Sequence, residues 1–114
     1  MADLRLPSQH TWSRPHRIVV DNETSSFFTI IEVFAYDFPG LLYSITDAIF
    51  RCKLDIWVAK IATKIDQVVD VFYVRDFDGQ KVDSPDHVAA IKAAIQDVLP
   101  EIGSKNTTKI KQGG

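Results

Sequence analysis

The sequence predicts an α+β fold in which an antiparallel sheet carries two helices on one face. Two observations lead to this prediction. Four segments have the composition of strands, whereas in two others the apolar residues recur with the spacing of one helical face. These segments follow one another in the order strand, strand, helix, strand, strand, helix, and the short links within each strand pair favour hairpins.

The first three elements lie between residues 17 and 53. Strands are expected at Arg17–Asp21 and Phe27–Tyr36, joined by the turn-forming cluster Asn22–Ser26. We expect a helix from Gly40 to about Lys53, because the apolar residues of this segment share one helical face. They are Leu41, Leu42, Ile45, Ala48, Ile49 and Cys52.

The last three elements begin with Leu54-Asp55, which starts the next strand. Strands are expected at Ile56–Ile65 and Val68–Asp76, and the short turn between them lacks the usual glycine. Ser84-Pro85-Asp86 is typical of a helix start, because a capping serine precedes a proline and a first-turn acid. Pro100 and Gly103 end this second helix.

Without its first strand, the order β-α-β-β-α is a ferredoxin-like split unit that lacks its final strand. We expect Arg17–Asp21 to replace that strand, antiparallel to Phe27–Tyr36. The domain then spans residues 17–100, with an extended arm or linker at 1–16 and a flexible tail at 101–114. As an alternative, Thr107–Ile110 adds an edge strand.

Alternation along the strands divides their residues between two faces. We assign one to the core beneath the helices: Thr29, Ile31, Val33, Ala35, Trp57, Ala59, Ile61, Thr63, Val69, Val71 and Tyr73. The outer face then holds Phe28, Ile30, Glu32, Phe34, Tyr36, Ile56, Val58, Lys60, Val68, Asp70, Phe72 and Val74. The outer face is too apolar for a solvated sheet and indicates an interface. The alternatives are that the faces are reversed or that the N-terminal arm covers the outer one.

Composition and motifs exclude several functions. A net charge of −2 gives no electrostatic footprint for nucleic acid or an anionic membrane. The sequence has no P-loop, dinucleotide-binding glycine motif, nucleophile elbow or metal-ligand cluster, so we expect no catalysis by this chain, no metal and no cofactor. The single cysteine, Cys52, is expected to be a buried thiol. A cytoplasmic setting is expected, because the sequence contains neither a signal peptide nor a membrane-spanning run.

The segment Asp37–Leu42 is the candidate site, because it links a strand tightly to a helix. Asp37 is expected to cap the helix, and Pro39 pre-sets the backbone at its start. Gly40 lets a ligand approach the backbone, and free amides at a helix start attract a carboxylate. The alternative is that this segment is only a structural turn.

Two parts of the sequence carry a family resemblance. Phe28–Val33 and Asp37–Tyr43 resemble the opening of an ACT domain. Leu54–Thr63 and the run Val-Asp-Val-Phe-Tyr-Val at 69–74 resemble the C-terminal ACT domain of bifunctional uridylyltransferase/uridylyl-removing enzymes, which modify the P-II nitrogen-signalling protein. The resemblance covers roughly residues 17–100, and the catalytic parts of those enzymes are absent from these residues.

The resemblance implies a regulatory domain that forms a homodimer or pairs with another ACT domain. It also implies that the domain binds a small amino acid, glutamine, at residues Asp37, Phe38, Gly40, Leu41, Leu42, Asp55, Ile56, Trp57, Val58 and Ala59. The family usually has Arg at position 38 and Asn at position 55, where Asp still offers an acceptor for an ammonium group. The alternative function is an interaction module that binds no small ligand.

Overall fold

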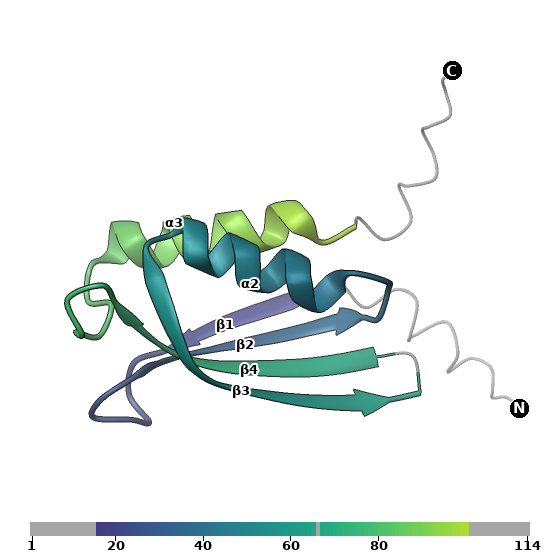
Figure 1. Ribbon diagram of the computed structural model, residues 1–114, viewed down its shortest axis with the longest axis horizontal. Helices are drawn as coiled ribbons and strands as arrows, with labels where there is room; N and C mark the ends of the chain where they lie inside the picture. The colour runs from purple at the N-terminus through teal and green to yellow at the C-terminus, as the bar shows by residue number, and fades with distance from the viewer. Residues whose placement is uncertain (1–15, 66, 101–114) are drawn as a thin grey trace, which may run out of the picture. The chain divides into compact units, whose positions relative to one another are not determined.

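The chain contains the predicted elements in the predicted order. The computed structural model describes residues 16–65 and 67–100, and it contains β1 (Arg17–Asp21), β2 (Thr29–Tyr36), α2 (Leu41–Arg51), β3 (Leu54–Lys64), β4 (Gln67–Asp76) and α3 (Pro85–Val98) (Figure 1). These elements lie in one unit, residues 16–99. The expected tail and the alternative strand at 107–110 lie outside the described residues, as does the expected arm except for its last residue.

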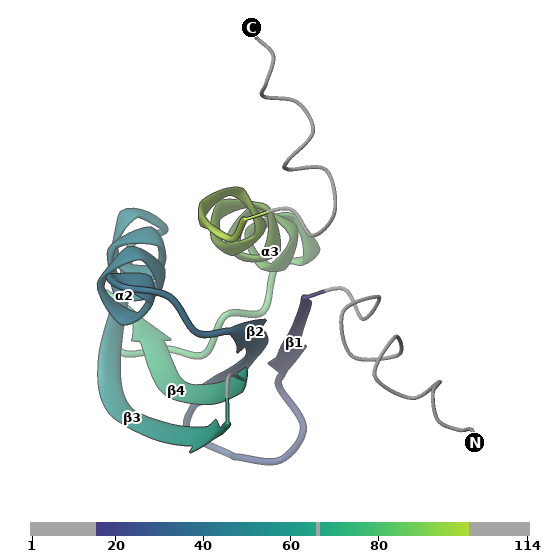
Figure 2. The same ribbon diagram turned by 90° about the vertical axis from the view of Figure 1, so that its right-hand side faces the viewer.

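The four strands form one antiparallel sheet in the order β1-β2-β4-β3. β1 pairs with β2 from Arg17 opposite Phe34 to Asp21 opposite Ile30, which confirms the predicted hairpin. Both helices cover the same face of this sheet (Figure 2). The predicted α+β class is therefore confirmed.

β2 begins at Thr29, two residues later than predicted. The Oγ atom of Ser25 accepts hydrogen bonds from the amides of Phe27 and Phe28, at 3.1 and 3.0 Å. Such a bond from a short polar side chain competes with strand pairing. It therefore holds these two residues in the turn before the strand.

Left-handed residues set two other boundaries. α2 ends at Arg51, and Lys53, which has φ 66°, donates from its amide to the carbonyl of Phe50 at 2.9 Å. In the β3–β4 hairpin Lys64 pairs with Gln67, so the connection between the strands is short. Ile65 there has φ 56°, the conformation for which such turns usually use glycine or asparagine. The predicted hairpin therefore forms without a glycine.

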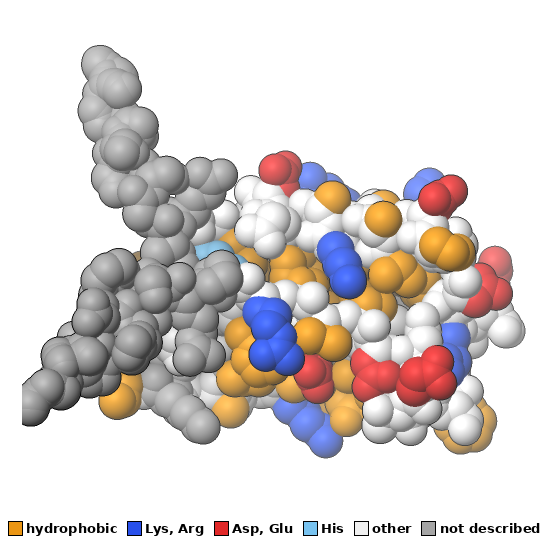
Figure 3. All heavy atoms as spheres, turned by 180° about the vertical axis from the view of Figure 1, so that it is seen from behind, with side chains coloured by type: hydrophobic (Ala, Val, Ile, Leu, Met, Phe, Trp, Pro, Cys, Tyr) orange, Lys and Arg blue, Asp and Glu red, His pale blue; other side chains and the backbone are white. Residues whose placement is uncertain are grey.

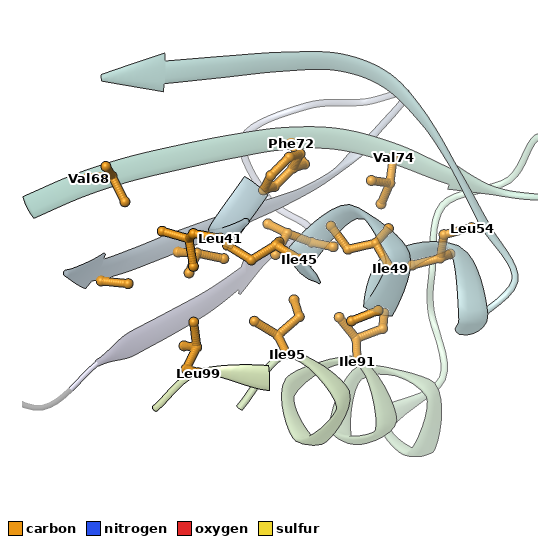
Figure 4. Packing of buried hydrophobic residues seen from close by; sticks show 14 of the residues in the cluster. Leu41, Ile45, Ile49, Leu54, Val68, Phe72, Val74, Ile91, Ile95 and Leu99 are labelled. Carbon is orange, nitrogen blue, oxygen red and sulfur yellow. The ribbon is translucent and has the colours of Figure 1, made fainter. Parts of the chain in front are cut away.

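The core lies between the sheet and the helices (Figure 4). Its buried residues are Ile31, Val33, Ala35, Leu41, Ile45, Ala48, Ile49, Leu54, Val68, Phe72, Val74, Val82, Ile91, Ile95 and Leu99. Half-buried residues of β1 and α3 extend it, namely Ile18, Val20, Val88 and Val98. Figure 3 shows hydrophobic side chains gathered between the helix and the strands on the side seen from behind.

The faces predicted for β4 are reversed. Ile31, on the core face of β2, pairs directly with Phe72 of β4, and directly paired residues share a face. Val68, Asp70, Phe72 and Val74 are therefore in the core, and Val69, Val71 and Tyr73 are on the outer face. Both sets are apolar except for one aspartate, so alternation within β4 alone does not distinguish them.

A bulge in β3 overturns two further assignments. The register shifts between Ile56 and Val58, which pair with Val74 and Tyr73 respectively. Ile56 therefore packs against the core, whereas Trp57 is 59% exposed. An extra residue in a strand moves the side chains on one side of it to the other face. Strict alternation of side chains along β3 does not predict such a bulge.

The outer face carries an aromatic cluster that stacks with a cation. The guanidinium carbon of Arg75 lies 4.5 Å from the ring centre of Phe28 and 4.9 Å from that of Trp57. Phe28 also meets Tyr73 edge to face, with 5.9 Å between the ring centres. The outer face is thus partly apolar, as predicted, although Phe72 is not part of it.

A closed set of hydrogen bonds ties the β1–β2 loop to the segment before α3. Asn22 Nδ2 donates to the Val82 carbonyl at 2.7 Å, the Thr29 hydroxyl donates to Asn22 Oδ1 at 2.6 Å, and the Val82 amide donates to the same hydroxyl at 2.9 Å. Thr29 and Val82 are buried. Lys81 Nζ adds bonds of 2.7 Å to the carbonyls of Asn22 and Ser25.

Asn22→Ala is expected to lower the free energy of unfolding by about 1–3 kcal/mol, because it leaves the Thr29 hydroxyl and the Val82 carbonyl without these partners. Urea denaturation measures this loss. Glu23→Ala is the control, since this neighbouring side chain is exposed. Equal stability of the two variants would show that the set does not hold the loops together.

Candidate functional site

The junction between β2 and α2 leaves the start of the helix open. The Leu41 amide donates to the Phe38 carbonyl at 3.0 Å, and Gly40, with φ 84°, is the N-cap residue. No side chain caps the helix, so the prediction that Asp37 does so is wrong. An atom at the Cβ position of Gly40 would have no neighbour within 4 Å. The following first-turn amides are therefore available to an anion.

The loop exposes some of the predicted site residues and buries others. Asp37, Gly40 and Leu42 are exposed, and Leu42 is 45% exposed. Leu41 is buried in the core, and Phe38 packs against it. Leu41 and Phe38 therefore anchor the junction, whereas the other three face solvent.

The second group of predicted site residues, Asp55–Ala59, lies elsewhere in the chain. Asp55 pairs with Arg75 near the end of β4, whereas the β2–α2 junction follows Tyr36, which pairs with Gln67 at the start of β4. Asp55 and the junction therefore lie at opposite ends of the sheet, and Ala59, which pairs with Phe72, lies between them. A single chain does not bring Asp55 to the junction.

Asp55 and Ile56 line a groove between α2 and the start of β3. The groove has a volume of about 340 Å³ and is also lined by Tyr43, Thr46, Asp47, Phe50 and Leu54. Tyr43 is 74% exposed and Phe50 is 61% exposed. This end of β3 therefore offers a mixed polar and aromatic surface.

Asp70 is the residue of the site region that the sequence did not reveal. It was expected on the outer face, but it lies on the core face of β4 between Val68 and Phe72 and is 2% exposed. Its Oδ1 atom has no hydrogen-bond partner. Figure 4 shows Leu41, the first residue of α2, at the same end of the core as Val68. Asp70 pairs with Val33 in the second half of β2, the strand that leads into the junction, so it lies in the half of the sheet next to the open start of the helix.

Burial makes ionisation of Asp70 unfavourable. Desolvation raises the pKa of Asp70 above its ordinary value of 3.8, and the negative charge of Asp37 raises it further. Asp37 follows the last residue of β2, and Asp70 pairs with Val33 of the same strand. The junction thus combines open amides with two acids, one exposed and one buried.

A larger concavity, which the sequence did not predict, lies between the β1–β2 and β4–α3 loops. Its volume is about 900 Å³, and its lining includes Glu23, Phe27, Arg75 and Lys81. Lys81 is engaged with backbone carbonyls there, and Arg75 stacks on the outer aromatic cluster. These two cations therefore already have structural roles.

Other chemical features of the described residues are sparse. They contain no group of three or more His, Cys, Asp or Glu side chains that could hold a metal ion. Cys52 was expected to be buried and is only half-buried, and burial raises the pKa of its thiol. No helix in the described part of the chain is long and apolar enough to cross a membrane.

The antiparallel sheet with two helices on one face makes this a ferredoxin-like α+β domain, and the arrangement is compatible with an ACT fold. The comparisons with known proteins give the particular family. Over 82 residues, or 72% of this chain, the sequence is 42% identical to the bifunctional uridylyltransferase/uridylyl-removing enzyme of Bradyrhizobium sp. (strain ORS 278). The chain is related to one domain-sized segment of these enzymes.

Two further relatives agree with this result. The enzyme of the same name from Azospirillum brasilense is 40% identical over 76% of this chain, and that of Gluconobacter oxydans is 40% identical over 77%. The matched segments make up 9% and 10% of those two enzymes, so the chain spans only about a tenth of their length. No family model and no solved structure matches the chain.

Asp70→Asn should stabilise the domain increasingly as the pH rises. The folded-state pKa of Asp70 is raised, so its contribution to stability is full below pH 3.8 and is lost as the pH rises through the folded-state pKa. Asn resembles the protonated acid and does not titrate. Unfolding free energies of variant and wild type, measured from about pH 4 to 8, should diverge in favour of the variant.

Asp97→Asn on the exposed side of α3 is the matched control, and its difference from wild type should not grow in this way. A difference for Asp70→Asn that stays constant with pH would contradict the raised pKa of Asp70.

Proposed function

We propose that the chain is a regulatory domain that senses glutamine for a cytoplasmic uridylyltransferase/uridylyl-removing enzyme and controls nitrogen signalling allosterically. The open, uncapped start of α2 is the observation that carries the proposal. Oriented amides at a helix start suit the carboxylate of an amino acid. The nearby acids Asp37 and Asp70 suit its ammonium group.

The choice of glutamine rests on the family. The relatives share about 40% identity with the chain and are named as uridylyltransferase/uridylyl-removing enzymes. The family resemblance of the junction implies glutamine as the ligand that reports nitrogen status. The geometry supports the chemical class, an amino acid with free carboxylate and ammonium groups, and the family supplies the particular side chain.

Pairing of two domains explains why predicted site residues lie at both ends of the sheet. β3 is an edge strand of eleven residues, and its outer edge has no partner strand in the described part of the chain. Two copies paired antiparallel through β3 would exchange ends about a two-fold axis. The Asp55–Ala59 segment of one copy would then approach the β2–α2 junction of the other, which completes the proposed site.

Such a site provides a route for signalling. Glutamine that contacts both domains of a pair binds the paired arrangement more tightly than a separated one. It therefore shifts the population toward that arrangement by the difference in binding free energy. Catalytic domains attached to the pair would respond to this shift.

The alternative is an interaction module that pairs and binds no small ligand. The exposed Trp57 and the aromatic cluster with Phe28 and Arg75 favour it, because exposed aromatic and arginine side chains are typical of interaction surfaces. Glutamine sensing and pure interaction differ in whether the domain gives a heat of binding with glutamine. A sensing domain releases or absorbs heat with glutamine, whereas a pure interaction module self-associates without responding to it.

Asp37→Ala is expected to weaken glutamine binding by about ten- to a hundredfold, because a charge-assisted hydrogen bond is worth about 1.5–3 kcal/mol. Asp37 caps no helix, so the variant should keep the stability of the wild type. Isothermal titration measures the affinity, and thermal unfolding checks the fold. Asp97→Ala is the control. The proposed site would be wrong if wild-type and Asp37→Ala chains bound glutamine equally well.

A further inference from the structure

Burial of the Asp70 carboxyl group has a cost, because its Oδ1 atom is left unpaired among the described residues. Asp70 is 2% exposed. Buried polar side chains are nearly always hydrogen-bonded, and buried carboxylates are nearly always paired. Asn or an aliphatic residue at this position would cost less. A group from outside the domain is therefore the natural partner for Asp70.

The neighbours of Asp70 across the sheet show from which side such a partner can arrive. On one side Asp70 pairs with Val33 of β2, which is buried under the helices. On the other side it pairs with Ile61 of β3, which is 47% exposed. Asp70 thus lies at the boundary between the covered and uncovered parts of one sheet face.

The uncovered part forms a small apolar shelf beside Asp70. It consists of Ala59, Ile61 and Thr63, which are exposed and share the face of Asp70 because they pair with Phe72, Asp70 and Val68. These side chains carry no charge. A small molecule resting on the shelf would lie beside Asp70, whose Oδ1 atom lacks a partner.

Charge determines what kind of group fits there. The negative charge of Asp37, which raises the pKa of Asp70, repels an anion. Asp70 has no salt bridge within the described residues, and Arg17, Lys60 and Arg75 stack on rings of the outer face. No group of three or more metal-binding side chains occurs in the same residues. A compact organic cation therefore fits better than a metal ion.

We propose that Asp70 is the acceptor for the ammonium group of the amino-acid ligand. This assignment rests on the proposed sensing function and adds a subsite to it. The ligand's carboxylate lies at the first-turn amides of α2, and its ammonium group lies between the shelf and Asp70. The charge that destabilises the free domain becomes paired when the ligand is bound, so binding removes a cost that the free domain carries.

The test compares two ligands with two proteins by isothermal titration. The ligands are glutamine and glutaramate, which has the same carboxylate and amide but no ammonium group. The wild type should bind glutamine at least tenfold more tightly than glutaramate. The Asp70→Asn variant should bind glutamine and glutaramate with equal affinity. Its unfolding temperature should equal or exceed that of the wild type. Asp97→Asn, an exposed site on α3, should behave as wild type.

The outcomes distinguish failure of the Asp70 subsite from failure of the proposed glutamine sensing. If folded Asp70→Asn still prefers glutamine by the wild-type factor, the assignment of Asp70 is overturned and glutamine sensing stands. If the wild type binds glutamine and glutaramate equally well, the assignment is overturned in the same way. If the wild type binds neither ligand, the sensing function is overturned and the Asp70 subsite with it.

Discussion

The pairing of β2 with β4 is the constraint on which the rest of the structure depends. Ile31 opposite Phe72 fixes which face of the two central strands meets the helices. Because side chains alternate, the same register places Asp70 on the helix side together with Phe72. A slip by one residue would free the aspartate but would expose the central aromatic residue of the core. The buried carboxylate is therefore a direct consequence of the register that forms the core.

Most of the fold could be predicted from the sequence, because its signals are local. Helical spacing after Gly40, the Ser84 cap and the strand-like segments gave every element to within a few residues. The faces of β4 could not be predicted, since Val69 and Val71 are as apolar as Val68 and Val74. The bulge at Trp57 depends on the register with β4, which alternation along β3 does not contain.

The candidate site was predictable only in part. The residue types of Asp37–Leu42 predict a junction that binds an anion, and in the structure Gly40 and not Asp37 is the N-cap of the helix, without a side-chain cap. The sequence places Asp70 on the outer face, because Glu32 and Lys60 mark that face as the charged one, and the structure places it on the core face. The domain thus keeps a buried acid that weakens it, beside a helix start without a cap. Both features are costs for the free domain, and a single ligand with a carboxylate and an ammonium group would offset both.

The most direct test of this account follows the carboxyl carbon of Asp70 by nuclear magnetic resonance. In the free chain its chemical shift should titrate with a pKa above 3.8. At neutral pH, added glutamine should shift this resonance together with the first-turn amides of α2, and glutaramate should shift the amides alone. If glutamine shifted the resonances of those amides but left the chemical shift of the Asp70 carboxyl carbon unchanged, Asp70 would not bind the ammonium group.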